Sequence, residues 1–209
     1  MRLSVHTDHR VFFAVMAGGY LLLVLLCAIL PARALEKRYP PTDERPSDLV
    51  ERGRQLYRAY GCITCHTQQI RGDERLAEEA EDGTLVVPVL GADLRFGVES
   101  PSTAAEYRND DPPFLGTQRT GPDLLAVGTR LPSPEWHFWH LYDPRSVSPG
   151  SVMPGLPWLF RTEETKQDGD EKVDPLFDLD VPKGRLYATP EAQALVEYLL
   201  SRTREASTR

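Results

Sequence analysis

The segment GCITCHTQQIR, residues 61–71, contains two thiols three positions apart and an imidazole directly after the second: Cys62, Cys65 and His66. Two cysteines at this spacing can each form a thioether to a haem vinyl group, and the adjacent histidine can bind the iron. The segment therefore predicts one covalently bound haem c and a domain folded around it. The third cysteine, Cys27, lies in an apolar stretch and is expected to act as a small apolar residue.

Two other interpretations of the cysteine pair fit the rest of the chain less well. A structural zinc site needs four protein ligands, and beyond the motif the polar part of the chain offers only His137 and His140, with no second cysteine pair. A thioredoxin-like redox pair would need a strand–helix–strand pattern around the motif, and the sequence lacks one. Covalent haem attachment is therefore the prediction that the residues favour.

An electron-transfer haem normally has a second axial ligand, and methionine is the first candidate. The chain has three methionines, and two of them belong to the N-terminal tail and apolar stretch, which leaves Met153. It lies in SPGSVMPGLPW, residues 148–158, where prolines stiffen the loop that would present the sulfur. A buried packing role for Met153, and ligation by either of the two remaining histidines, are the alternatives that the sequence leaves open.

Residues 11–30, VFFAVMAGGYLLLVLLCAIL, form 20 consecutive residues without a charge. A helix of this length spans roughly 30 Å, the hydrocarbon thickness of a bilayer. The A-x-A sequence at residues 32–34 resembles a signal-peptide cleavage site, but the apolar run exceeds the roughly 7–15 residues of a signal peptide. We therefore predict a retained anchor that contacts membrane lipid through one helix. Basic residues flank the run on both sides and do not fix its orientation.

The predicted organisation is mainly α-helical, with three parts. Residues 1–34 form the tail and membrane anchor, residues 35–46 a charged, proline-containing linker, and residues 47–209 a haem domain with long loops. Within the haem domain we predict an acidic insertion at residues 72–113 and a charged surface loop at residues 162–188.

Three helices of the haem domain are expected from caps and apolar periodicity. Ser47 can cap the first, and Ser133 and Thr189 are each followed by a proline that suits the first turn of a helix. The first and last of these helices have apolar faces at helical spacing, so we expect them to pack together. Gly53 on the first would allow a close crossing.

The charge of the chain restricts its partners. The formal net charge is −7, and residues 1–34 hold three of the 24 basic and one of the 31 acidic residues, so the remainder carries about −9. Binding to a phosphate backbone needs a surplus of Lys and Arg, so nucleic acid is not an expected partner. A cationic protein partner is compatible with this charge.

Three sequence segments follow the predicted anchor in an order that is typical of one protein family. The segments GCITCHTQQIR, GTQRTGPDLLAVGTR and EWHFWHLYDPRSVSPGSVMPGLPWL resemble the monohaem cytochrome c subunit (subunit II, CcoO/FixO type) of cbb3-type haem–copper cytochrome c oxidases. The resemblance covers the anchor, residues 61–71 and residues 114–159. It fails between residues 72 and 113 and is loose after residue 160, in regions that normally meet neighbouring subunits.

The resemblance implies a class I cytochrome c-like domain and a role for each motif residue. Cys62 and Cys65 would hold the haem, His66 would be the proximal ligand of the iron, and Met153 the distal ligand. By likeness to c-type cytochromes generally, the carbonyl of Pro122 would accept the ring proton of His66. Three arginines are candidates to pair with the haem propionates: Arg119, Arg130 and Arg145.

The resemblance also implies a function in respiration. The chain would be a non-catalytic, electron-transferring subunit of a terminal oxidase, anchored in the bacterial inner membrane with its haem domain on the periplasmic side. It would accept electrons from a dihaem cytochrome c subunit or a soluble cytochrome c and pass them to a catalytic haem–copper subunit that reduces oxygen. The alternatives are the small cytochrome c subunit of a nitric oxide reductase and a free-standing, membrane-tethered electron shuttle.

Overall fold

The computed structural model describes residues 9–43, 45–83, 85–94, 98, 100–176 and 185–204. These residues fall into two compact units, Met1–Glu44 with Thr103–Asp111, and Arg45–Ser102 with Pro112–Arg209. The first unit contains the apolar helix. The second contains the CxxCH motif and every other residue predicted to touch the haem.

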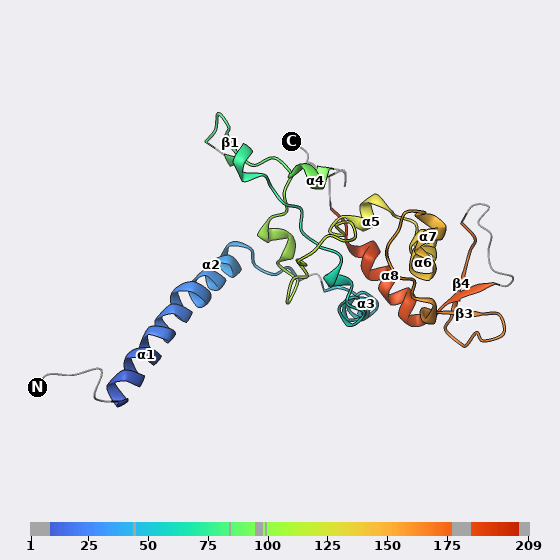
Figure 1. The fold of residues 1–209 in the computed structure, drawn as a ribbon, viewed down its shortest axis with the longest axis horizontal. Coiled ribbons are helices and arrows are strands. Elements are labelled where there is room, and N and C mark those ends of the chain that lie inside the picture. Colours follow the sequence, from blue (N-terminus) through green and yellow to red (C-terminus); the bar gives the residue numbers. More distant parts are fainter. Residues whose placement is uncertain are drawn as a thin grey trace, which may run out of the picture. The chain divides into compact units, whose positions relative to one another are not determined.

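The first unit is built on one continuous helix of 30 residues, formed by α1 (His9–Val24), the π turn η1 (Leu25–Ile29) and α2 (Leu30–Arg38) (Figure 1). Its most apolar window has a mean hydropathy of 2.6, and none of that window is buried within the structure. The predicted apolar helix is therefore confirmed. The helix continues to Arg38, so the prediction of a linker from residue 35 was wrong for its first four residues, whose Leu, Glu, Lys and Arg all favour helix.

A widened turn interrupts the hydrogen bonding of this helix. The amide of Leu30 donates to the carbonyl of Leu25, five residues back, and Pro31 follows directly. Proline has no N–H and removes one bond from a regular helix, and a π turn is one way a helix accommodates that loss. Beyond the helix, the same unit contains the short turn η4 (Ala104–Tyr107), and Thr42 N donates to Oδ1 of Asn109 at 2.9 Å.

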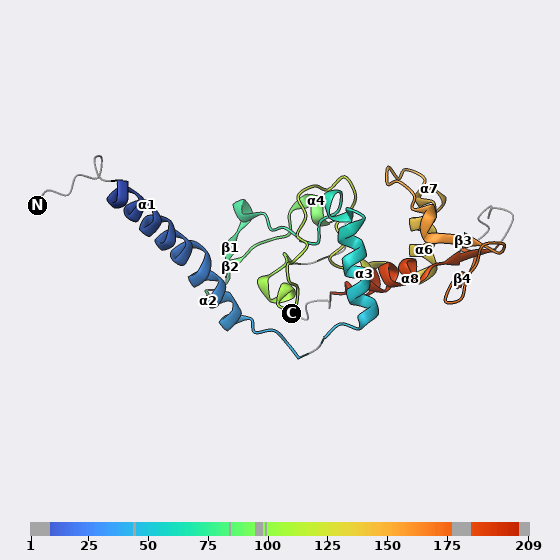
Figure 2. The same ribbon diagram turned by 90° about the horizontal axis from the view of Figure 1, so that it is seen from below.

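In the second unit, α3 (Asp48–Ala59) and α8 (Pro190–Ser201) lie against each other, as both ribbon views show (Figures 1 and 2). Both begin at the predicted caps, because Ser47 and Thr189 each accept a hydrogen bond from the backbone amide three residues ahead. The close crossing predicted at Gly53 is also confirmed. A Cβ at this position would overlap the carbonyl of Ala194 and lie 2.7 Å from Cβ of Tyr198.

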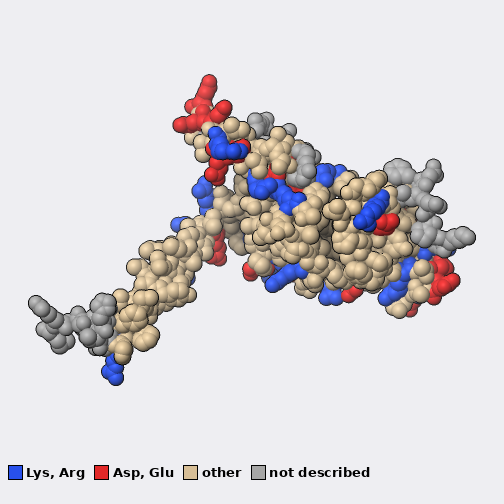
Figure 3. Space-filling model, in the orientation of Figure 1, with Lys and Arg blue, Asp and Glu red and all other residues tan. Residues whose placement is uncertain are grey.

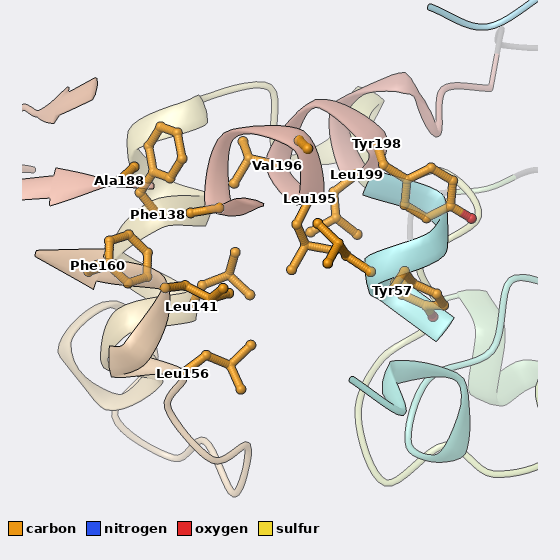
Figure 4. Packing of buried hydrophobic residues seen from close by; sticks show 14 of the residues in the cluster. Tyr57, Phe138, Leu141, Leu156, Phe160, Ala188, Leu195, Val196, Tyr198 and Leu199 are labelled. Atoms are coloured by element: carbon orange, nitrogen blue, oxygen red, sulfur yellow. The ribbon is translucent and has the colours of Figure 1, made fainter. Parts of the chain in front are cut away.

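A third helix, α6 (Pro134–Tyr142), begins at Ser133 as predicted and is followed by α7 (Pro144–Val147). The short helix α5 (Val127–Arg130) packs on α8. Apolar side chains from these elements form one core with the C-terminal helix (Figure 4). Its members include Tyr57, Phe138, Leu141, Leu156, Phe160, Leu195, Val196, Tyr198 and Leu199.

Residues 162–188 do not form only a surface loop, and that prediction was wrong. Strands β3 (Phe160–Thr162), β4 (Glu171–Val173) and β5 (Leu186–Ala188) make an antiparallel sheet in the order β3-β5-β4. All three residues of β5 are buried. Strands of three residues are too short to show the alternation by which a strand is recognised, so the charged residues around them dominated the prediction. Residues 177–184 lie outside the described residues.

The acidic segment after the haem motif contains the turn η3 (Glu74–Leu76), strands β1 (Glu78–Glu79) and β2 (Leu85–Val86), and α4 (Gly91–Leu94). Acidic side chains gather over the β1 hairpin (Figure 3). The segment is nevertheless not wholly solvated, because Val89 and Asp93 are buried. The acidic insertion therefore has buried contacts as well as exposed acidic side chains.

The crossing of α3 and α8 yields a testable expectation. Gly53→Ala should lower the free energy of unfolding by about 1–3 kcal/mol, because the added methyl group forces two helix backbones apart. Gly91→Ala is the matched control, since a Cβ there would meet nothing within 4 Å. The melting temperatures of the two variants compare them directly. Equal melting temperatures would show that the two helices can move apart without a loss in the free energy of unfolding.

Candidate haem-binding site

The CxxCH motif lies directly after α3 in one tight turn. Gly61 has φ = +71°, in the left-handed region that favours glycine, and the 3-10 turn η2 (Cys62–Thr64) follows it. The amide of His66 donates to the Cys62 carbonyl at 2.9 Å and closes the turn. Cys62 is half-buried against the core and Cys65 is exposed, and both are free thiols. Burial raises the pKa of the Cys62 thiol to about 11, so it is protonated at neutral pH.

The imidazole of His66 is 9% exposed and is held by the loop that follows Arg119. Its Nδ1 donates to the carbonyl oxygen of Pro122 at 2.7 Å. A carbonyl can only accept, so the proton is on Nδ1 and the lone pair is on Nε2. Burial lowers the pKa of His66, which favours the neutral form that a metal ligand requires. The hydrogen bond implied by likeness to c-type cytochromes is thus present.

Two backbone hydrogen bonds join the haem motif to this loop. Gly121 N donates to the Cys65 carbonyl at 2.9 Å, and Leu124 N donates to the Thr67 carbonyl at 2.8 Å. The approach is so close that a Cβ on Gly121 would overlap the His66 ring and lie 2.7 Å from both ring nitrogens. Only glycine leaves the space that this imidazole occupies.

Met153 lies in the loop between α7 and the short turn η5 (Pro157–Leu159). Its side chain is half-buried and packs against the same apolar core as Cys62. The loop is fixed at both ends of the methionine, because Met153 N donates to Oγ of Ser151 at 3.2 Å and Leu156 N donates to the Leu141 carbonyl at 2.7 Å. A weakly binding thioether needs a loop held in this way.

The two histidines that compete with Met153 have different surroundings. Nε2 of His137 lies 2.9 Å from the Leu131 carbonyl, so this ring is bonded to backbone. His140 stacks on Trp136 with ring centroids 4.6 Å apart, and its buried Nδ1 has no hydrogen-bond partner among the described residues. Burial, with the nearby His137 and His66, lowers the pKa of His140 to about 4, so the ring is neutral.

A protein-family model described as cytochrome c oxidase, mono-heme subunit/FixO matches residues 4–206, nearly the whole chain. The chain belongs to this family. Comparison with curated proteins gives no match. The resemblance seen in the motifs is confirmed. The matched range also extends through residues 72–113, where the motifs alone showed no likeness, and past residue 160, where the likeness was loose. The chain is therefore a membrane-anchored, monohaem cytochrome c subunit of a cytochrome c oxidase, an oxidoreductase complex of several subunits.

The residues of this monohaem subunit fit a haem on structural grounds. Two free thiols and a histidine with its Nε2 lone pair available lie on one turn of chain. Glycine at position 121 leaves the room that the His66 ring itself occupies, so the chain is built to hold this imidazole in place. Within the part of the chain that the structure describes, the buried Nδ1 of His140 also has no hydrogen-bond partner, as expected of a polar atom that lies beside a bound group.

The three arginines predicted to meet the propionates lie in different environments. Arg145 is exposed on α7, and Nη2 of Arg130 donates to the Asp123 carbonyl at 3.1 Å. The guanidinium of Arg119 pairs with two buried carboxylates, those of Asp93 and Asp123. Protein carboxylates therefore engage Arg119, and propionate pairing stays a prediction for all three arginines.

Two buried carboxylates behind the haem motif, Asp93 and Asp123, were not among the predicted site residues. Asp123 could have been found from its place in the GPDL segment, next to the predicted acceptor Pro122. Asp93 carried no such signal, because it lies among many exposed acidic residues and nothing in its neighbours marks it as buried.

Proposed function

We propose that the subunit binds one haem c covalently through Cys62 and Cys65, with His66 as the proximal and Met153 as the distal ligand of the iron. The observation that carries the proposal is the 2.7 Å hydrogen bond from His66 Nδ1 to the Pro122 carbonyl. This bond fixes the tautomer, orients the ring and increases the basicity of Nε2, as the outer partners of metal-binding histidines do.

The haem and its two protein ligands would have separate roles in electron transfer. The bound haem supplies one-electron exchange between its ferric and ferrous states. His66 and Met153 would both hold the iron, so this subunit would not bind oxygen. Oxygen reduction therefore belongs to another subunit, and this chain is an electron relay without catalytic chemistry of its own.

The proposed electron path runs from a dihaem cytochrome c subunit or a soluble cytochrome c, through this subunit, to the catalytic haem–copper subunit. Family membership in a multi-subunit oxidase supports a path between subunits. The close crossing of α3 and α8, the first and last helices of residues 47–209, supports a class I cytochrome c-like domain. The apolar helix would contact lipid, and the acidic surface makes nucleic acid an unsuitable partner.

Purification of the full-length protein in mild detergent tests this function. We expect a haem–copper subunit to co-purify and the complex to consume oxygen with a reduced c-type cytochrome as donor. Consumption of nitric oxide but not oxygen would instead place the chain in a nitric oxide reductase. A native mass equal to one chain plus one haem would indicate a free-standing shuttle.

The proposed topology places the second unit on the periplasmic side of the bacterial inner membrane. Its support is chemical, because c-type haem is attached outside the cytoplasm in this family of respiratory proteins. Protease added to intact spheroplasts should therefore remove the haem-stained domain and leave the anchor. Full protection of the haem domain, with digestion after lysis, would contradict this orientation.

A further inference from the structure

The acidic segment contains one carboxylate that solvent does not reach. Asp93, in α4, has no exposed surface although both of its chain neighbours are exposed. Its Oδ2 accepts a hydrogen bond from the Arg71 amide at 2.8 Å and lies 3.7 Å from Nε of the same residue. Its Oδ1 forms an ion pair with Nη1 of Arg119. A buried charge is tolerated only with such partners, so these contacts fix where α4 lies.

Arg119 connects this carboxylate to the haem motif. Its Nε donates to Oγ1 of Thr67 at 2.6 Å, and its Nη2 donates to the Gln69 carbonyl. Nη2 also lies 3.4 Å from Oδ2 of Asp123. The rigid fork of donors on a guanidinium suits a site where several acceptors at fixed positions must be bridged.

The residues that Arg119 contacts are adjacent to the pair that orients the haem ligand. Thr67 follows His66, and Asp123 follows Pro122. Thr67 Oγ1 donates to Asp123 Oδ2 at 2.5 Å, so a side-chain bond runs next to the bond from the imidazole to the carbonyl. Arg119 supports both segments at once.

We propose that Asp93 is a positioning residue for His66 and acts through Arg119. The acidic segment would thereby stabilise the electron-transfer site, because the side chain of Asp93 holds Arg119, and Arg119 keeps Thr67 and Asp123 next to each other. This inference rests on the proposed function, in which His66 binds the haem iron.

Loss of the Asp93 charge should loosen this arrangement. An asparagine would remove one of the two carboxylates that the buried guanidinium of Arg119 pairs with, so the guanidinium would shift toward Asp123, which remains charged. Its contacts to Thr67 and Gln69 would shift with it, and the His66–Pro122 hydrogen bond would lengthen. A weaker bond makes the imidazole a poorer donor to ferric iron, and the lost anion acts in the same direction.

The test compares full-length haem-loaded variants in detergent. Asp93→Asn should retain covalently bound haem, show a higher midpoint potential in a spectroscopic redox titration, and show shifted g-values in the electron paramagnetic resonance spectrum of its ferric form. Asp73→Asn is the matched control, because Asp73 belongs to the same segment but pairs with Arg75, whose side chain is 82% exposed. The control should leave the potential and the g-values unchanged.

The g-values of the variants decide whether Asp93 positions His66. Unchanged g-values in Asp93→Asn, with or without a higher potential, would overturn it, because a charge effect alone does not reorient a ligand. If Asp93→Asn does not accumulate, Arg119→Lys keeps the positive charge without the fork. A g-value shift in that variant supports the role, and wild-type g-values overturn it. Failure of the wild-type protein to show covalent haem with His/Met ligation would refute the proposed function instead.

Discussion

Replacement of Met153 by Ala or Leu should leave a haem-containing protein that no longer behaves as an electron-transfer cytochrome. The thioethers at Cys62 and Cys65 and the bond from His66 do not involve this residue, so the haem should remain attached. The long-wavelength sulfur–iron(III) absorption band should disappear. The midpoint potential should fall by on the order of 0.1 V or more, since axial ligands set haem potentials over a range of roughly 0.8 V.

Binding of carbon monoxide gives an independent measure of the same change. The ferrous Met153 variant should bind it at the vacated position, whereas the wild-type protein should not. Met16→Leu is the matched control, because this methionine lies on α1 and should change neither the band nor the potential. If the Met153 variant keeps both properties, Met153 is a packing residue. His140 would then be the next ligand to test, since His137 is bonded to backbone.

Gly121→Ala should produce the second large effect, at the residue that makes room for the His66 ring. The methyl group would overlap the His66 ring, so the imidazole must leave its position or the loop must move away from the motif. We expect a loss of about 1–3 kcal/mol in the free energy of unfolding, together with weakening of the His66–Pro122 hydrogen bond. Thermal unfolding and the visible spectrum of the haem measure the two effects.

Gly150→Ala provides the comparison for this variant. A Cβ at Gly150 would meet nothing within 4 Å, and this glycine lies in the loop that carries Met153. It should change the melting temperature and the spectrum little. A Gly121 variant with wild-type stability and spectrum would mean that the loop yields easily and does not hold the histidine.

The parts of the fold that follow from local chemistry were predictable. Each helix start rests on a single polar side chain followed by a fixed pattern, and Ser47, Ser133 and Thr189 all cap where expected. The close crossing at Gly53 followed from the apolar faces of two helices, because these faces must be buried and a glycine permits close approach. Such features depend on a few neighbouring residues, and the sequence shows them directly.

The parts that depend on distant partners were not predictable. The strand Leu186–Ala188 is recognised only through its pairing with β3 and β4, both of which are equally short. The burial of Asp93 arises from Arg71 and Arg119, which are 22 and 26 positions away in the sequence. In the candidate site, the CxxCH turn and the acceptor Pro122 could be predicted, whereas the ion pairs behind them required the folded chain.

The π turn in the apolar helix has a consequence for the neighbours of that helix in a membrane. A turn with hydrogen bonds to the fifth residue adds about one residue of rotation, or about 100°, relative to a regular α-helix. The stripe of side chains that α1 presents along one side is therefore not continued by α2. The two halves of the helix face different directions around the same axis, so each can contact a different transmembrane segment. A helical wheel drawn with 3.6 residues per turn through residues 9–38 would therefore place the side chains of α2 on the wrong side of the helix relative to those of α1.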